Sequence, residues 1–376
     1  MERINAMQKY DVAAYIWPSY TGDEPRSRQF WPEGIGEWQS VKNSVRKTPD
    51  YFWNRKPLWG YVNEADPYVM ESQISCAHDH GVNVFIYDWY WYDRRPFLEQ
   101  CLNNGYLGAK NNDLVKFYIM WANHDANNTW NINLSDDFSS TVIWEGSQPR
   151  DEFEKVVHRI IEKYFSHPSY YKIDGKPVFM FYDLRNLVKG LGGADEAARA
   201  LEWFRSETVK AGFPGLHLQA AAWVINGTNL SGVDSVGGGL SKAQFESLGF
   251  DSVTHYQFAH FCDMNRDYLD ILKDVQKQYD TIDQNYAKNI YFPHVSIGWD
   301  NNPRFKRFGG AVTRNNAPAN FERGLRMAKD YLERHPNQHK LVTVNSWNEW
   351  TETSYLEPDD LYGYGYLEAV KRVFGE

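Results

Sequence analysis

Strand-like and helical segments alternate along most of this 376-residue chain. Short apolar runs, rich in β-branched and aromatic residues, have the character of buried strands. They cover residues 12–16, 82–87, 115–120, 177–182, 216–221, 252–255, 290–295 and 341–345. Helical patterns occupy residues 67–80, 97–104, 151–165, 194–211, 242–248, 266–286, 317–335 and 364–373. This alternation predicts parallel strands, because a parallel pair needs a crossover connection that is usually a helix.

Eight consecutive strand–helix units predict an α/β protein with the (β/α)8 (TIM) barrel fold and long βα loops. We expect residues 1–376 to form a single barrel domain, in which a long loop at residues 18–66 delays the first helix. The alternative architecture is a doubly wound open sheet. A nucleotide-binding sheet of that kind would need a glycine-rich turn after an early strand. The glycines at 190–193 and 237–239 lie elsewhere and lack that spacing, so we interpret them as flexible loops.

The charge and the cysteine content exclude several classes of partner. The formal net charge of −9 and the lack of a basic run argue against nucleic acid. No apolar run is long enough to cross a bilayer, and the N-terminus lacks the apolar stretch of a signal peptide. We therefore expect a cytoplasmic location, or a periplasmic or surface location if a signal peptide was removed. Cys76, Cys101 and Cys262 are too few for a disulfide framework and lack zinc-site spacing, so we expect no metal and no cofactor. No motif sets an oligomeric state.

Aromatic residues make up 16% of the chain, and many stand beside polar residues, as at 87–93. Rings with polar handles suit sugars, whose CH faces stack and whose hydroxyls need partners. In a barrel, the residues just past each strand face the active site. The residues at such positions that we expect to bind substrate are Trp17, Tyr20, Asp88, Trp89, Trp121, Asn123, His124, Tyr182, His255, Tyr256, Trp299, Asp300 and Arg304. They predict a deep polar pocket whose aromatic wall comes from Trp17, Trp89, Trp121 and Trp299.

The last strand-like run leads into a cluster of three carboxylates, Glu349, Glu352 and Glu357. Glycoside chemistry needs one group to protonate a leaving oxygen and another to act as base or nucleophile. An apolar wall raises the pKa of a carboxyl and so suits it to act as an acid near neutral pH. We therefore expect Glu349 and Glu352 to be catalytic; the alternative is that they are solvated acids on a loop. The neighbouring side chains that we expect to contact substrate are Trp347, Asn348 and Trp350.

Other barrel chemistries find less support in the sequence. There is no Gly-x-Ser-x-Gly motif, so a serine-type hydrolase is not indicated. Lysines are not conspicuous at the strand ends, which argues against Schiff-base chemistry. His255, His260 and Cys262 do not have the spacing of a zinc site.

Five stretches of the chain resemble a known family. They are residues 34–41, 120–124 with Trp130 beyond, 170–178, 298–304 and 345–359. Together they resemble the WbsX-type proteins of polysaccharide loci, which are similar to glycoside hydrolase family 99. The resemblance implies a (β/α)8 barrel that acts on an oligo- or polysaccharide. Family 99 contains endo-acting α-mannosidases that cleave with retention, and their Asn-Glu-Trp-x-Glu motif maps onto Glu349 and Glu352. The resemblance implies that Glu349 deprotonates the substrate's 2-hydroxyl to give a 1,2-anhydro sugar. It also implies that Glu352 acts as general acid and then as base.

The chain departs from the family pattern at two positions. Thr353 replaces a glycine after the second glutamate, and His124 stands where the WbsX pattern has a glutamate. If the enzyme used a covalent nucleophile instead, Asp300 or Asp88 would be the candidate. The function that we expect is a retaining glycoside hydrolase. The alternatives are a glycosyltransferase of polysaccharide biosynthesis and a non-catalytic glycan-binding barrel. The chain also has three arginines near the expected pocket, namely Arg185, Arg304 and Arg307. We expect them either to recognise an acidic sugar or sulfate, or to pair with nearby Asp or Glu side chains.

Overall fold

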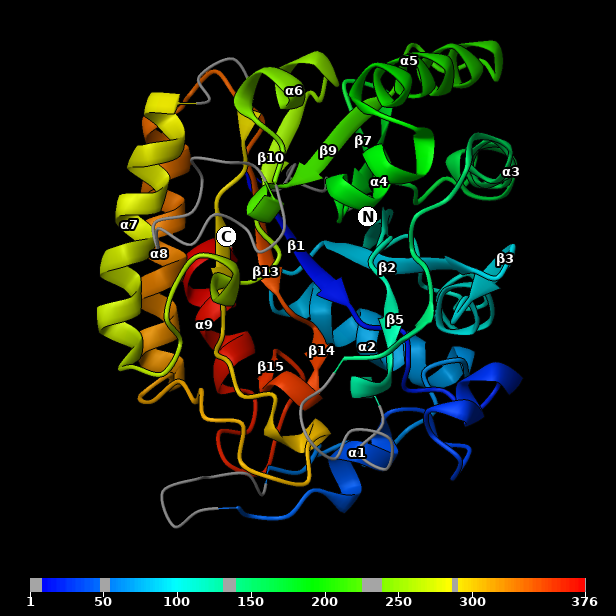
Figure 1. Ribbon diagram of the computed structural model, residues 1–376. Coiled ribbons are helices and arrows are strands. Elements are labelled where there is room, and N and C mark those ends of the chain that lie inside the picture. Colours follow the sequence, from blue (N-terminus) through cyan, green and yellow to red (C-terminus); the bar gives the residue numbers. More distant parts are fainter. Residues whose placement is uncertain (1–8, 48–54, 131–139, 225–238, 286–289, 376) are drawn as a thin grey trace, which may run out of the picture.

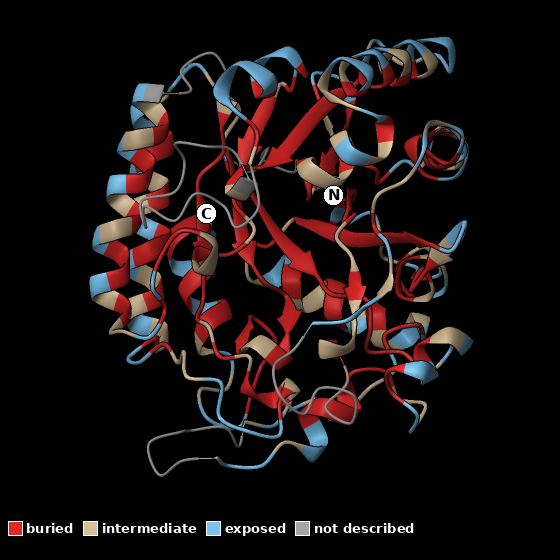
Figure 2. Cartoon of the chain, in the orientation of Figure 1, coloured by how far each residue is buried: buried red, intermediate tan, exposed pale blue. Residues whose placement is uncertain are grey.

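The computed structural model describes residues 9–47, 55–130, 140–224, 239–285 and 290–375. A parallel sheet lies at its centre, with strands in the order β11-β10-β9-β8-β4-β2-β1-β13-β12 (Figure 1). These strands are β1 (Asp11–Ile16), β2 (Val84–Tyr92), β4 (Lys116–Trp121), β8 (Lys176–Phe181), β9 (His217–Ala221), β10 (Ser252–Thr254), β11 (Ile290–Tyr291), β12 (His294–Ser296) and β13 (Leu341–Asn345). Nearly all their residues are buried (Figure 2).

The sheet closes because β11 and β12 are two pieces of one segment. β11 pairs with β10, whereas β12 pairs with β13. Phe292 and Pro293 separate the pieces, and proline has no N–H to give to a ladder. The ladder continues across them, because Phe292 N donates to Val253 O at 3.0 Å and Thr343 N donates to Pro293 O at 3.0 Å. The predicted (β/α)8 barrel is therefore confirmed.

Helices surround the barrel and cover its outer face (Figure 1). The α-helices are α1 (Trp38–Asn43), which belongs to the long loop at the end of the barrel, and α2 (Pro67–Asp79), α3 (Arg150–Ile160), α4 (Leu184–Leu191), α5 (Ala194–Lys210), α6 (Lys242–Ser247), α7 (Tyr268–Asn285), α8 (Pro318–Arg334) and α9 (Gly365–Phe374). Helix α3 buries the apolar stripe formed by Phe153, Val156, Val157 and Ile160. It continues into the π-helix η4 (Ile161–Phe165). Among the described residues, no helix has the length and apolar character needed to cross a membrane.

Short elements decorate the loops between strands and helices. The short strands are β3 (Arg95–Phe97), β5 (Ala126–Asn127), β6 (Val142–Trp144), β7 (Lys172–Ile173), β14 (Asn348–Glu349) and β15 (Ser354–Tyr355). The remaining short helices are η1 (Pro25–Gln29), η2 (Cys101–Tyr106), η3 (Asn128–Trp130), η5 (Ala222–Val224), η6 (Phe258–His260), η7 (Asn302–Arg304) and η8 (Trp350–Glu352).

Two local predictions were wrong. The helix expected at residues 97–104 is replaced by strand β3 and the π-helix η2, because β2 runs on to Tyr92 and forms a hairpin in which Tyr90 pairs with Phe97. The glycine stretch expected to be a loop at 190–193 begins inside α4, where a side chain on Gly190 would meet the backbone of Gln148 at 2.3 Å. Of the other predicted glycine loop, residues 237 and 238 lie outside the described residues.

The described parts of the long loop, residues 18–47 and 55–66, lie at the end of the barrel and contain η1 and α1. Gly36 has a φ of 59°, and a Cβ there would meet Ser19 O at 1.7 Å. Only glycine tolerates this close backbone approach. The turn places Glu37 at the start of α1 with no exposed surface. This loop therefore brings a carboxylate to the rim where β1 and β13 end.

Candidate active site

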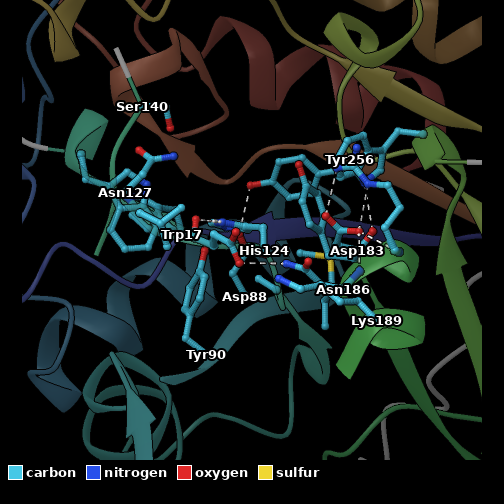
Figure 3. Close-up of a pocket in the computed structure, with 18 of the residues that line it drawn as sticks. Trp17, Asp88, Tyr90, His124, Asn127, Ser140, Asp183, Asn186, Lys189 and Tyr256 are labelled. Carbon is cyan, nitrogen blue, oxygen red and sulfur yellow. Dashed lines mark hydrogen bonds and ion pairs between the residues drawn. The ribbon is translucent and has the colours of Figure 1, made fainter. Parts of the chain in front are cut away.

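A pocket of about 830 Å³ opens at the C-terminal ends of the barrel strands. Its size fits a small-molecule or glycan site. The residues predicted from sequence that line it are Trp17, Asp88, His124, Tyr182, Tyr256, Arg304, Glu349 and Glu352. Figure 3 shows Trp17, Tyr90 and Asn127 on one side of the view, Asp183, Asn186 and Lys189 on the other, and Asp88 and His124 between them. The pocket therefore lies where the strand-end argument predicted it.

The alternation of side chains along β2 and β4 decides which aromatic rings reach the pocket. Asp88 and Tyr90 point inward, so Trp89 between them points to the outer face. Trp89 donates its indole N–H to Glu99 Oε1 at 2.8 Å. On β4, Trp121 packs against Phe153 of α3, with the ring centroids 6.1 Å apart. The expectation that Trp89 and Trp121 form the pocket wall is wrong, because both rings lie between the sheet and the helix layer.

The same alternation places His255 away from the pocket. Tyr256 lines the pocket, whereas His255 Nδ1 lies 2.9 Å from Tyr291 Oη and its Nε2 lies 3.4 Å from Gln278 of α7. Asn123 also lies outside the pocket. It exchanges hydrogen bonds of 2.7 and 2.8 Å with the backbone of Asp183 and so joins two strand ends. Neither side chain therefore lines the pocket.

Trp299 and Asp300 are not part of the pocket lining either. Asp300 N donates to Glu352 O at 2.7 Å, and Thr353 Oγ1 donates to Asp300 O at 3.3 Å. Asn302 donates to Asp300 Oδ1 from both its backbone and its side chain. Burial raises the pKa of Asp300 to about 6. Asp300 therefore supports the loop that contains Glu352, and its placement does not suit a nucleophile.

The loop after β13 presents Glu349 and Glu352 while its tryptophans stay buried behind it. Ser346 Oγ accepts from Glu349 N at 2.7 Å, and Tyr20 Oη accepts from Trp350 N at 3.1 Å. The Trp350 ring stacks on Tyr355 at 3.7 Å. Tyr20, Trp347, Asn348 and Trp350 are fully buried and lie outside the pocket lining. These side chains shape the loop instead.

Thr353 ends that loop in the left-handed conformation, with a φ of 54°. Glycine adopts this conformation without strain, whereas a β-branched residue does so rarely. Thr353 therefore stands, at the position where the family pattern has a glycine, in a conformation that glycine would adopt without strain.

Arg304 is the centre of charge in the site. Its two terminal nitrogens donate to Glu352 Oε1 and to Glu349 Oε1, each at 2.8 Å. Its Nε donates to Glu37 Oε1 at 2.9 Å. Because one planar guanidinium binds both glutamates, Glu349 and Glu352 lie side by side on the same side of the pocket.

Glu37 is a member of the site that sequence reasoning missed. It bonds to Arg304 and accepts the indole N–H of Trp17. A signal was present, because Glu37 lies within the stretch 34–41 on which the family resemblance rests. Arg304 therefore binds three carboxylates, those of Glu37, Glu349 and Glu352, with a single positive charge.

Tyr256 connects a further carboxylate, that of Asp88, to Glu349. Its hydroxyl lies 3.0 Å from Asp88 Oδ2 and 3.3 Å from Glu349 Oε2. Asp88 Oδ1 and Glu352 Oε2 are buried and have no hydrogen-bond partner among the residues that the structure describes. Buried acceptors of this kind cost free energy unless a donor reaches them. The hydroxyls of a bound sugar would supply such donors.

The buried carboxyls of the site hold protons more tightly than free ones. Burial raises the pKa of Glu349 well above its usual range, and the neighbouring Glu352 raises it further, while Arg304 opposes this. Burial also raises the pKa of Glu352, again against Arg304. The pKa of Asp88 is raised well above its usual range by burial, although the Tyr256 hydroxyl favours its charged form. The site therefore keeps protonated carboxyls at a pH at which an ordinary carboxyl is ionised.

His124 and Arg185 complete the polar part of the lining. Burial lowers the pKa of His124, so it is neutral near pH 7. Arg185 pairs with Asp183 at 3.1 Å, and its guanidinium lies 4.5 Å from the Trp223 ring centroid. Arg307 is exposed and lies outside the lining. Among the described residues, no group of three or more His, Cys, Asp or Glu side chains has an arrangement that would hold a metal ion.

Proteins of similar sequence are longer than this chain. The protein WxcX of Xanthomonas campestris pv. campestris, described as uncharacterized, is 25% identical over 367 residues. The match covers 93% of this chain and 47% of WxcX. WxcX from a second strain of the same organism is 24% identical over 361 residues. The chain therefore spans about half the length of the curated relatives that it matches.

Solved structures share the barrel fold. A glycoside hydrolase-like protein has a TM-score of 0.62 at 17% identity, with 98% of this chain and 94% of that chain covered. The GH99 endo-alpha-mannosidase from Bacteroides thetaiotaomicron has a TM-score of 0.59 at 14% identity, covering 96% and 95%. The beta-glucosidase from Thermotoga maritima has a TM-score of 0.51 at 10% identity, covering 97% of each chain. At these identities the likeness concerns the fold.

A family model covers nearly the whole chain. It matches residues 12–370, from within β1 to within α9, and therefore includes the residues of the candidate site. This chain belongs to the family described as glycosyltransferase WbsX.

Proposed function

We propose that this protein is a glycoside hydrolase that cleaves a glycan with retention of configuration, and that residues 1–376 act as one catalytic domain. The observation that supports it most is the binding of Glu349 and Glu352 to one guanidinium, inside a pocket with unpartnered acceptors on Asp88 and Glu352. Retaining enzymes with a covalent intermediate place their two carboxylates on either side of the scissile bond. Carboxylates on the same side suit a reaction in which both act on oxygens of one sugar.

In the proposed first step, Glu352 protonates the glycosidic oxygen and Glu349 removes the proton of the 2-hydroxyl. The bond between C1 and the leaving oxygen breaks as a bond between O2 and C1 forms, which gives a 1,2-anhydro sugar. In the second step, Glu352 takes a proton from water as the water oxygen attacks C1 and the bond between C1 and O2 breaks. Glu349 returns its proton to O2. Each step inverts C1, so the product retains the original configuration.

The surroundings of the two glutamates support these roles. Burial and Glu352 raise the pKa of Glu349 well above its usual range, and Arg304 opposes this rise and so increases the ionised fraction that can act as a base. Glu352 Oε1 is bound to Arg304, whereas its Oε2 has no partner and is free to meet the leaving oxygen. Burial raises the pKa of Glu352, as a general acid near neutral pH requires.

The test is a pair of glutamine variants assayed on two kinds of substrate. A screen of polysaccharides, read by product chromatography, first identifies a substrate. Glu352→Gln should then lose activity about 100-fold or more on the natural glycoside but keep the first step on a substrate with an activated leaving group. Glu349→Gln should lose activity on both. Glu162→Gln, an exposed glutamate on η4, is the matched control and should keep full activity.

Two results would contradict the proposal. One is full activity of Glu349→Gln together with loss of activity in Asp88→Asn, which would make Asp88 a covalent nucleophile. A 2-deoxy-2-fluoro substrate reports on the same point, because it has no 2-hydroxyl and should neither turn over nor label the protein. The other is turnover of a nucleotide sugar that depends on Glu349 while glycans are left intact, which would make the protein a transferase.

A further inference from the structure

A second pair of buried carboxyls lies behind the candidate active site and outside its lining. Glu64 has no exposed surface and Glu357 is 2% exposed. The side-chain amide of Gln73, on α2, donates to Glu64 Oε1 at 3.3 Å and to Glu357 Oε1 at 2.8 Å. The orientation of this amide is set by Trp347, which donates to Gln73 Oε1 at 3.1 Å. The two carboxyls are therefore brought together on one donor group.

Each carboxyl of this pair binds a residue next to Glu349. Asn348 Nδ2 donates to both oxygens of Glu64, at 3.1 and 2.9 Å. The Trp350 indole N–H donates to Glu357 Oε2 at 2.5 Å. The residues before and after Glu349 are thus tied, one each, to Glu64 and Glu357.

The surroundings of the pair contain no compensating positive charge. In the part of the chain that the structure describes, no ion pair joins Glu64 or Glu357 to a lysine, arginine or histidine. The other titratable groups that face the pair are neutral thiols and phenols, namely Cys76 on α2, Cys101 on η2, Tyr87 on β2 and Tyr20 in the long loop. Two buried like charges with no counter-ion cannot both ionise without a large cost, so the pair retains a proton.

The titration of the two groups agrees with this arrangement. Burial raises the pKa of Glu64 to about 7, although the hydrogen bonds from Asn348 and Gln73 favour its charged form. Burial also raises the pKa of Glu357 well above its usual range, and the charge on Glu64 raises it further. Glu64 has the larger number of donors, so the proton resides on Glu357.

We propose that Glu64 and Glu357 form a proton-sharing positioning pair that fixes Asn348, Glu349 and Trp350 in place. One protonated carboxyl makes the pair attractive, because its O–H donates to the neighbouring carboxylate. Loss of that proton makes the pair repulsive and releases the residues on both sides of Glu349. The catalytic consequence rests on the proposed function, whereas the shared proton and the order of the loop do not.

Three variants test the pair. Glu357→Gln keeps a neutral donor beside Glu64 and an acceptor for Trp350 but loses the bond that Glu357 Oε1 accepts from Gln73, so it mimics the protonated state at every pH except at that one bond. Glu357→Ala removes both. Glu162→Gln is again the exposed control. Thermal unfolding is measured between about pH 5 and about pH 9, a range that spans the ordinary and the raised carboxyl pKa values.

The sign of the stability change follows from the raised pKa. The folded protein binds the shared proton more tightly than the unfolded chain does, so its stabilising effect is present below the ordinary carboxyl pKa and is lost as the pH rises toward the raised pKa of Glu357. Glu357→Gln has no such proton to lose. The difference in melting temperature between Glu357→Gln and Glu162→Gln should therefore grow in favour of Glu357→Gln as the pH rises. Parallel curves for these two variants over the whole range would overturn the shared proton.

Hydrogen exchange of the peptide that contains residues 345–352 tests positioning without any assay of activity. Compared at one pH, Glu357→Ala should exchange faster than Glu162→Gln in this peptide, whereas Glu357→Gln should match Glu162→Gln. Equal exchange in all three variants would overturn the positioning role. If these results hold and no variant acts on glycans, the proposed function fails while the pair stands.

With a substrate in hand, the kinetic constants separate positioning from stability. Glu357→Ala should lower kcat about 10- to 100-fold with little change in KM, because a small displacement of a reacting group has an effect of that size. Glu357→Gln should keep kcat within about fivefold, the equivalent of one ordinary hydrogen bond. Equal kcat values for Glu357→Ala and Glu357→Gln would contradict the expectation that the glutamine side chain keeps Glu349 in position.

Discussion

Trp17 and Asn348 exchange two hydrogen bonds across the rim of the barrel. The backbone N–H of Trp17 donates to Asn348 Oδ1 at 2.8 Å, and Asn348 Nδ2 donates to Trp17 O at 3.0 Å. Trp17 follows β1 and Asn348 follows β13, which are neighbours in the barrel. This reciprocal pair fixes an aromatic ring of the pocket relative to the adjacent Glu349.

The first prediction concerns this ring. Trp17→Leu should lower kcat/KM by the equivalent of about 1–3 kcal/mol, because a stacking surface for the sugar is lost. Steady-state kinetics on the identified glycan measure this. Trp121→Leu is the matched control: its ring packs against α3, so the melting temperature should fall while kcat/KM stays unchanged. Equal losses of kcat/KM in both variants would contradict the placement of the two rings.

The second prediction concerns the charge at the centre of the site. Arg304 favours the ionised form of Glu349, so Arg304→Gln should raise the pKa of Glu349 further. A smaller fraction of Glu349 is then ionised at a given pH, and the acid limb of the kcat/KM profile should move to higher pH. We expect a loss of about 100-fold or more near neutral pH. Arg307→Gln removes an exposed arginine nearby and should leave the profile unchanged; an unshifted limb in Arg304→Gln would argue against Glu349 as the base.

The sequence predicted the barrel and the location of its site because both depend on local patterns. Each strand-like run overlaps an observed strand, although the run at 290–295 overlaps both β11 and β12 and β2 extends five residues beyond the run at 82–87; the run at 341–345 coincides with β13. Once the order of strands and helices indicated a barrel, the strand ends located the pocket. Asp88, Tyr256 and Glu349 are residues that this argument predicted for the pocket and that line it in the structure.

The facing of the rings could not be predicted in the same way. Residues 89–92 read Trp-Tyr-Trp-Tyr, so both faces of β2 are aromatic and no polar alternation marks the inner one. Trp89 and Trp91 proved to face the helix layer, where they donate to Glu99 and Glu152. A stretch of strand with aromatic residues on both faces carries no local signal of which face points inward.

Glu37 illustrates a second limit. It lies 267 positions from Arg304 in the chain, inside a loop without the regular periodicity of a strand or helix. Its position depends on the close backbone approach at Gly36, which the sequence does not reveal. A contact of this range emerges only from the closed barrel.

The third prediction concerns the phenol that joins Asp88 to Glu349. Tyr256→Phe removes a hydrogen-bond donor from both carboxylates, which raises the pKa of each. We expect kcat to fall by about 10-fold, the size expected for hydrogen bonds to charged groups. The acid limb of the pH profile should also move to higher pH, as in Arg304→Gln. A loss of kcat without any such movement would indicate that Tyr256 acts on the substrate directly.

The fourth prediction concerns Asp300, whose pKa burial raises to about 6. An unfolded aspartate titrates near pH 4, so the folded protein binds this proton more tightly than the unfolded chain does. Its contribution to stability is therefore present at low pH and is lost as the pH rises from about 4 through about 6. Asp300→Asn removes this titration, so its free energy of unfolding should fall less across that window, by at most roughly 3 kcal/mol.

Calorimetry at several pH values measures the difference, and Asp113→Asn, which changes an exposed aspartate, should follow the unmodified protein. Activity of Asp300→Asn separates support of the loop from chemistry. Asp300 lies outside the pocket lining and bonds to the loop through its backbone, which the substitution leaves intact. We therefore expect kcat/KM within about twofold of the unmodified protein at neutral pH, as is usual for a substitution away from the reacting atoms. A folded Asp300→Asn variant without activity would indicate that Asp300 is a covalent nucleophile. It would contradict the catalytic roles proposed for Glu349 and Glu352.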